Sequence, residues 1–226
     1  MTAVLFDYPK GTGFGRVLPK KKIYEHSGPS AAVKGLFVRQ VEQIVWQYKL
    51  APETVNLKPA RAVPEIQIFR IALKTGELKH DVLQCIDRAI PFPILFELRY
   101  EEKIKAIAAF KRPSDADRSK WVVSDYFEST WLPTDAPRTP LPVALDLEVL
   151  YAHMLTALMP FPVRPGEGLQ ARVERMEQTR SKQRELGKCE ARLRKEKQFN
   201  RKVAINAELR DLKQELAELT RLKAEG

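Results

Sequence analysis

Three ionisable residues that are far apart in the sequence could together form a metal-dependent nuclease site. Glu42 falls in a segment expected to be helical, whereas Glu97 and Lys111 fall in two segments expected to pair as a β-hairpin. Restriction-type nucleases hold Mg²⁺ with carboxylates at such a position and use a lysine to polarise the attacking water. Glu65 or Asp81 would supply a further carboxylate.

The local pattern around this set departs from that of known nucleases. The string Glu97-Leu98-Arg99 is a degenerate acidic-x-lysine motif, and no Pro-Asp pair precedes it. An acidic residue that alternates with leucines also fits the polar face of a strand. The glycines of Gly11–Gly15 lack the Lys-Ser/Thr ending of a phosphate-binding loop, so we expect a flexible loop there.

Other residue types that carry chemistry are sparse. His26, His80 and His153 form no ligand pair, and Cys85 and Cys189 have no neighbouring ligand pattern, so we expect neither a metal nor a cofactor. Two unpaired cysteines fit a reducing cytosol. No apolar run approaches the roughly 18 residues that cross a bilayer, and the first residues do not have the pattern of a signal peptide. We therefore expect a cytoplasmic protein without membrane contact.

The distribution of positive charge points to a different kind of partner. The chain has 39 basic and 29 acidic residues, and residues 180–202 hold ten basic against three acidic residues. Such a stretch is a solvated helix face, a surface that follows nucleic-acid phosphates, or a docking site for an acidic protein. The candidate DNA-contacting residues are Arg180, Lys182, Arg184, Lys188, Arg192, Arg194, Lys195, Lys197, Arg201 and Lys202, together with Lys20, Lys21 and Lys22 near the start of the chain.

The segment from residue 167 onward is expected to be helical throughout. It contains no proline, and its spacing predicts one long helix or a helix pair that folds back at Gly187. Four leucines at three-four-three spacing indicate a coiled-coil seam. We expect this seam to pair with a second copy of the chain or with another protein. The four are Leu209, Leu212, Leu216 and Leu219.

Residues 30–50 are predicted to form one amphipathic helix. Ser30 suits the N-cap position, and Ala51-Pro52 ends the segment. Apolar residues recur along it at intervals of three or four, which places them on one face. They are Val33, Phe37, Val41, Ile44 and Tyr48.

The following segments alternate between strand and helix patterns. Their order predicts an α+β or α/β domain, with a mixed sheet flanked by helices and followed by the long C-terminal helix. We expect a sheet domain over residues 1–131, a proline-rich connector with one helix over 132–166, and the basic helix over 167–226. The expected elements are strands over 65–73, 94–100, 104–111 and 120–130, and helices over 78–90 and 145–159.

Several strings together resemble a bacterial family that is catalogued as domain of unknown function 4391. They include Leu5–Lys10, Phe37–Trp46, Pro64–Phe69 and Lys195–Val203, and the resemblance covers nearly the whole chain. It implies genes that lie beside those of DNA methyltransferases and superfamily 2 helicases, in restriction-modification or phage-defence islands. It supplies no catalytic residues.

The charge pattern and this resemblance lead to one expected function and two alternatives. We expect a non-catalytic accessory subunit of a phage-defence complex, which docks on a helicase or methyltransferase and holds the DNA backbone through its basic C-terminal helix. The alternatives are a divergent Mg²⁺-dependent nuclease and a protein–protein adaptor that makes no DNA contact.

Overall fold

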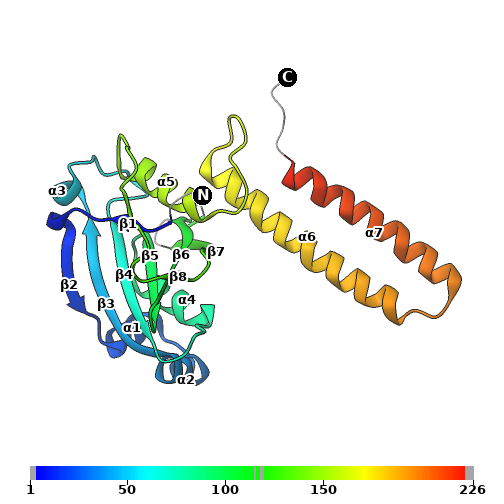
Figure 1. Ribbon diagram of the computed structural model, residues 1–226, viewed down its shortest axis with the longest axis horizontal. Helices are drawn as coiled ribbons and strands as arrows, with labels where there is room; N and C mark the ends of the chain where they lie inside the picture. Colours follow the sequence, from blue (N-terminus) through cyan, green and yellow to red (C-terminus); the bar gives the residue numbers. More distant parts are fainter. Residues whose placement is uncertain (1–3, 115, 118–119, 222–226) are drawn as a thin grey trace. The chain divides into compact units, whose positions relative to one another are not determined.

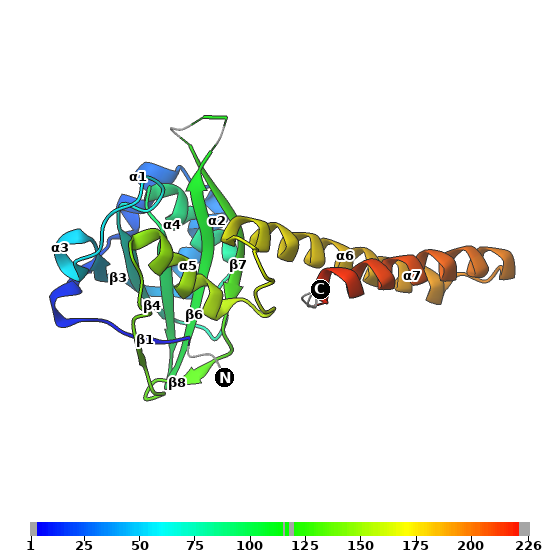
Figure 2. The ribbon, with the colours of Figure 1, turned by 90° about the horizontal axis from the view of Figure 1, so that it is seen from above.

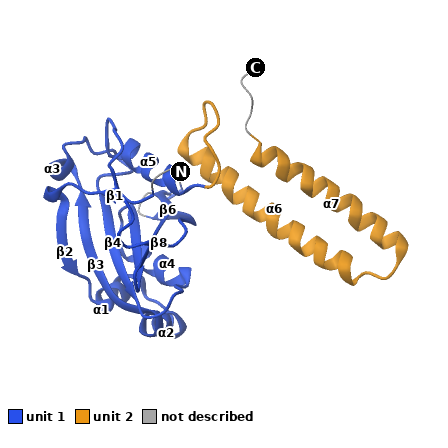
Figure 3. Cartoon of the chain, viewed as in Figure 1, with its two compact units in different colours: residues 1–159 blue, residues 160–226 orange. Residues whose placement is uncertain are grey.

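The chain folds into two compact units, residues 1–159 and residues 160–226 (Figure 3). The computed structural model describes residues 4–114, 116–117 and 120–221. The segment expected to be a connector, residues 132–166, is divided between the two units.

The first unit is built on a mixed β-sheet, which confirms the predicted α+β class (Figure 1). Strands β4 and β5 run parallel, while the other neighbouring strands are antiparallel. A parallel pair needs a crossover connection, and helix α4 (His80–Ala89) supplies it. In spatial order the strands are β2 (Gly13–Val17), β3 (Val41–Leu50), β4 (Ile66–Leu73), β5 (Ile94–Tyr100), β6 (Lys103–Pro113) and β7 (Trp121–Glu128), with β8 (Leu132–Pro133) beside β6.

Helices cover both faces of this sheet. Helices α1 (Lys20–Ser27), α2 (Ala31–Gln40) and α4 lie on one side, and α5 (Leu147–Leu158) lies on the other (Figure 2). The apolar face of α4 packs on the sheet, because its Val82, Leu83 and Ile86 are fully buried. Short elements complete the unit. They are β1 (Phe6–Asp7), which pairs with β9 (Thr139–Pro140), the 3₁₀ turn Lys10–Thr12, and α3 (Pro52–Val55).

The helix predicted over residues 30–50 is wrong in its second half. Helix α2 ends at Gln40, and Val41 begins the ten-residue strand β3. The predicted N-cap is confirmed, since the Ser30 hydroxyl accepts from the Val33 N–H at 3.4 Å. Val41–Leu50 is rich in β-branched and aromatic residues, and its pairing with strands on both sides outweighs a helical apolar spacing.

Residues 11–27 contain more regular structure than expected. The glycine segment is not a free loop, because Gly13 opens strand β2, and Gly15 adopts a φ of +64° where the register with β3 shifts. Lys20 begins helix α1, and its ammonium donates to the carbonyls of Phe37 (3.0 Å) and Val41 (2.6 Å). These carbonyls lie at the end of α2, so Lys20 caps that helix.

The second unit is a helical hairpin. Helix α6 (Leu169–Lys195) is continuous through Gly187, and the chain reverses at residues 196–198 before α7 (Phe199–Thr220) (Figure 1). The sequence thus forms a helix pair, with its turn nine residues beyond the glycine at which a reversal was expected.

The leucine seam faces the partner helix within this hairpin. Leu209 and Leu212 are buried with Cys189, and Leu186, Leu193 and Ile205 pack around them. Leu216 and Leu219 are partly exposed. The homodimer expected through these leucines stays a prediction, and in this structure two of the four already contact their own chain.

The capping role of Lys20 predicts a loss of stability on substitution. Lys20→Met keeps the aliphatic stem but removes two hydrogen bonds from a charged donor, and should lower the free energy of unfolding by about 1–2 kcal/mol. Urea denaturation followed by circular dichroism measures this. The neighbouring Lys21 is exposed, so Lys21→Met should change stability by less than about 0.5 kcal/mol. Equal effects of the two substitutions would contradict the capping role.

Candidate nucleic-acid interface

The structure does not assemble the nuclease set, because Glu97 and Lys111 lie on opposite faces of the sheet. Phe96 and Leu98 flank Glu97 on β5 and pack in the core beneath α4. Since side chains alternate along a strand, Glu97 points away from α4. The Lys111 ammonium instead reaches the C-terminal end of α4.

The remaining carboxylates of the set do not join either residue. Glu42 is exposed on β3, and Asp81 is exposed in the first turn of α4. Glu65 pairs with Lys49 at 3.4 Å. Within the described ranges, no group of three or more His, Cys, Asp or Glu residues could hold a metal ion. The geometry therefore provides no support for the Mg²⁺ site considered from the sequence.

Lys111 is a buried structural cation. Only 1% of the residue is exposed, and its ammonium donates to the carbonyls of Asp87 and Ile90, both at 2.5 Å. Its nitrogen also lies 3.3 Å from the Asp87 carboxylate, which accepts from the Tyr126 hydroxyl at 2.5 Å. Burial lowers the pKa of Lys111 and raises the pKa of Asp87, since each charge loses hydration. The polar atoms of this cluster thus serve to hold the end of α4 to β6 and β7.

Glu97 is the centre of a second buried cluster on the opposite face. The residue is fully buried, and its carboxylate accepts from Arg138 at 2.7 Å and lies 3.4 Å from an Arg70 nitrogen. Arg70 and Glu97 are register partners on β4 and β5. The sequence pattern did not predict these arginines as partners of Glu97. The signal that could have found them is the pair of apolar strands, since a carboxylate buried in such a strand requires a cationic partner.

The candidate DNA-contacting residues of the C-terminal segment lie together on the helical hairpin. Two of them form ion pairs: Lys182 with Glu185 and Glu215, and Arg192 with Glu208. Arg180 is partly exposed. The others are exposed, and none of them has an ion-pair partner among the described residues. These exposed cations are Arg184, Lys188, Arg194, Lys195, Lys197, Arg201 and Lys202.

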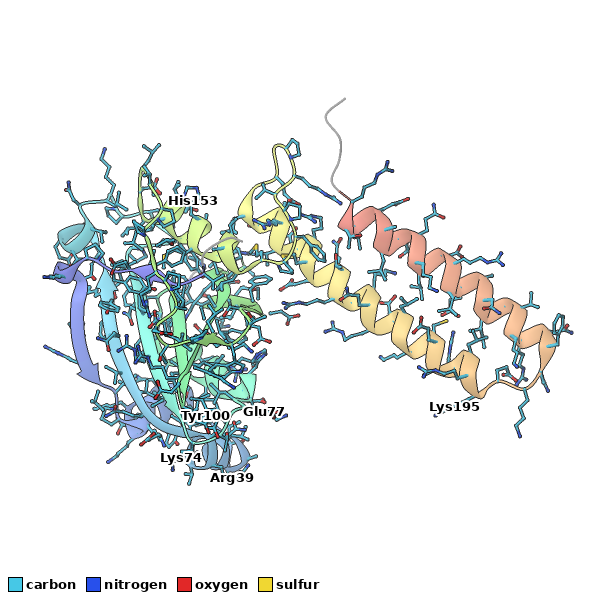
Figure 4. All side chains as sticks on the ribbon, in the orientation of Figure 1. Arg39, Lys74, Glu77, Tyr100, His153 and Lys195 are labelled. Atoms are coloured by element: carbon cyan, nitrogen blue, oxygen red, sulfur yellow. The ribbon has the colours of Figure 1, made fainter. Side chains whose placement is uncertain are left out.

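Positive charge is densest where the hairpin turns. Residues 194–202 hold five basic residues and one acidic residue, and Lys195 marks the end of α6 in Figure 4. A hollow between the two helices at this end is lined by three basic and two acidic residues, Arg192, Lys195, Arg201, Glu196 and Glu208, together with Ala204 and Ile205. We call residues 194–202 the basic tip. Its surface can hold polyanions through charge, with no requirement for a particular base.

The three lysines near the start of the chain belong to the other compact unit. They begin helix α1 in the sheet unit, where Lys20 caps α2 and Lys22 lies 3.4 Å from Glu25. Lys21 and Lys22 are exposed.

The fold and these surfaces define an α+β sheet protein that carries a basic helical hairpin. A family model described as domain of unknown function DUF4391 matches residues 6–216, and the chain belongs to this family. No curated protein and no solved structure matches the chain. Among the residues that the structure describes, none of the helices has the length and apolar character that crossing a membrane requires.

The buried Lys111–Asp87 pair predicts strong coupling between two substitutions. Lys111→Met and Asp87→Asn should each lower the free energy of unfolding by about 3–5 kcal/mol, because each leaves a buried partner uncompensated. The double variant should lose less than the sum of the two, by about 0.5–3 kcal/mol. Denaturant titration of the four proteins measures this coupling.

An exposed ion pair provides the control for this comparison of single and double variants. Lys120 and Asp117 lie 3.0 Å apart, with 76% of the Lys120 side chain exposed. Lys120→Met and Asp117→Asn should each change the free energy of unfolding by less than about 1 kcal/mol. Additive losses at Lys111 and Asp87 would show that the two residues do not act as a pair.

Proposed function

We propose that this protein is a non-catalytic accessory subunit of a DNA-processing complex, and that it holds the phosphate backbone of DNA on its helical hairpin. The observation that carries the proposal is the set of exposed cations without ion-pair partners, among the described residues, at and near the basic tip. Cations that neutralise DNA phosphates release condensed counterions, and this release drives binding independently of sequence.

Helix stability explains some of these cations but not others. Arg192, Arg194 and Lys195 lie in the last turn of α6, where positive charge complements the helix dipole. Arg201 and Lys202 lie at the start of α7, where positive charge is unfavourable and no acidic residue is present in the first turn. Within the fold, Glu196 attracts Arg201 and Lys202 from just before the helix. A phosphate bound at this position would be attracted both to these cations and to the N-terminus of α7.

The wider setting is also part of the proposal. Two buried free cysteines accord with a cytoplasmic protein. The DNA-directed setting rests on the charge of the hairpin and on the family resemblance, which associates such chains with methyltransferases and helicases of restriction-modification and phage-defence systems. We propose a helicase or methyltransferase as the protein partner.

The proposal predicts a change in the salt dependence of DNA binding. Lys197, Arg201 and Lys202 should each neutralise one phosphate, so replacing all three by glutamine should reduce the slope of log Kobs against log[salt] by about 0.9 for each phosphate that is no longer neutralised. Helix α7 should remain folded, because the substitutions at Arg201 and Lys202 remove charges that oppose its dipole. Fluorescence anisotropy of labelled duplex DNA across a salt series measures the slope.

A matched control removes the same charge elsewhere. Lys58, Arg61 and Lys103 are exposed residues of the sheet unit, and their replacement by glutamine should leave the slope near that of the unaltered protein. If the two triple variants have the same slope, the hairpin does not contact DNA. The adaptor interpretation would then take its place.

A further inference from the structure

The cluster around Glu97 contains more positive charge than the fold requires. Arg70, Arg99 and Arg138 surround this one buried carboxylate, which leaves two positive charges in excess. Arg138 also donates to the carbonyl of Phe6 at 2.7 Å, which ties strand β1 to the cluster. The side chains of Arg70 and Arg138 are each 24% exposed, so solvent reaches the cluster.

Three buried donors of this cluster have no acceptor in the part of the chain that the structure describes. The Tyr8 hydroxyl, the Arg70 Nε and the Arg99 Nε are buried without a hydrogen-bond partner among the described residues. Tyr8 is only 7% exposed, and its ring stacks on Tyr48 with the centroids 4.5 Å apart. Native proteins leave few buried polar groups unpaired, so three in one cluster require an explanation.

The phenol of Tyr8 is suited to donate to an anion. Burial, with the charge of Glu97, holds the pKa of Tyr8 well above its ordinary value, while Arg138 and Arg70 oppose this shift. The hydroxyl therefore stays protonated at neutral pH. Its proton has no acceptor among the described residues, and the surrounding charge is positive.

We propose that Arg70, Arg99, Arg138 and Tyr8 form a binding site for a terminal phosphate group. A phosphate monoester carries about −1.5 to −2 charges at pH 7, which matches the excess positive charge of the cluster. Its oxygens accept several hydrogen bonds at once, and the planar fork of arginine fits them in pairs. The site belongs to the sheet unit and does not depend on the basic tip.

The unpartnered hydroxyl allows a test that separates binding from folding. Tyr8→Phe removes a group that the fold does not use, so its stability should equal or exceed that of the unaltered protein. It should weaken the binding of inorganic phosphate about tenfold or more, because a hydrogen bond to a charged group is removed. Isothermal titration calorimetry of the full chain at constant ionic strength measures the affinity, and Arg99→Gln should weaken it similarly.

Two control variants localise the effect. Tyr100, labelled in Figure 4, follows Arg99 on β5 but packs against the core on the opposite face of the sheet. Tyr100→Phe should therefore bind phosphate as the unaltered protein does. The triple glutamine variant at Lys197, Arg201 and Lys202 should also keep its affinity for inorganic phosphate. The proposal is overturned if the unaltered protein shows no saturable binding, if Tyr8→Phe and Arg99→Gln bind normally, or if the hairpin variant loses the binding.

The source of the phosphate is distinguished by two further ligands. A nucleoside monophosphate and a short oligonucleotide with or without a 5′-phosphate carry the same group. If the 5′-phosphate strengthens oligonucleotide binding and Tyr8→Phe abolishes the gain, the site holds a DNA end. If the monophosphate binds as tightly as the phosphorylated oligonucleotide, the site holds a free nucleotide.

Discussion

The cost of burying a charge without a partner determines which ionisable residues of this protein hold the fold together. Lys111 and Asp87 are both buried, and the structure satisfies them with each other, with Tyr126 and with the carbonyls at the end of α4. Glu97 is likewise satisfied by Arg70 and Arg138. In the sequence, Glu97 and Lys111 resemble part of a catalytic set, but in the structure their charges lie on opposite faces of one sheet.

The same constraint identifies the groups that remain available to a ligand. The cations of the basic tip are exposed to water and form no ion pair with a carboxylate among the described residues. A polyanion can therefore bind them without first breaking an ion pair, and its own condensed counterions are released. The Tyr8 hydroxyl is the opposite case, because it is removed from water and has no partner in the described part of the chain. Exposed unpaired charge suits weak binding along a backbone, whereas buried unpaired donors suit one specific anion.

Segments with one clear periodicity were predictable from the sequence. The central strand β4, helix α4 and the hairpin of β5 and β6 follow their apolar patterns closely. Residues 41–50 were not predictable in this way, because their apolar spacing fits a helix and only pairing with β2 and β4 makes them a strand. Helix α1 was missed because Pro19 and the three lysines resemble a turn.

The candidate sites were predictable only as far as they are local in sequence. The hairpin charge lies within one stretch of residues 180–202, and the structure keeps most of it exposed. The Glu97 cluster draws on Tyr8, Arg70, Arg99 and Arg138, which come from segments up to 130 residues apart (Arg138 less Tyr8). No spacing rule joins them, since their proximity follows from strand register and from the pairing of β1 with β9.

Cross-linking at the basic tip tests the central claim of this account most directly. Phe199 is 77% exposed in the first turn of α7, so a photoreactive phenylalanine analogue there would lie among the cations proposed to contact phosphate. We expect a DNA adduct at low salt that fades as salt is raised, and none with the analogue at Val143, which is 93% exposed in the sheet unit. Equal adducts at the two positions, or no DNA adduct at Phe199 under any salt condition, would contradict DNA binding by the hairpin.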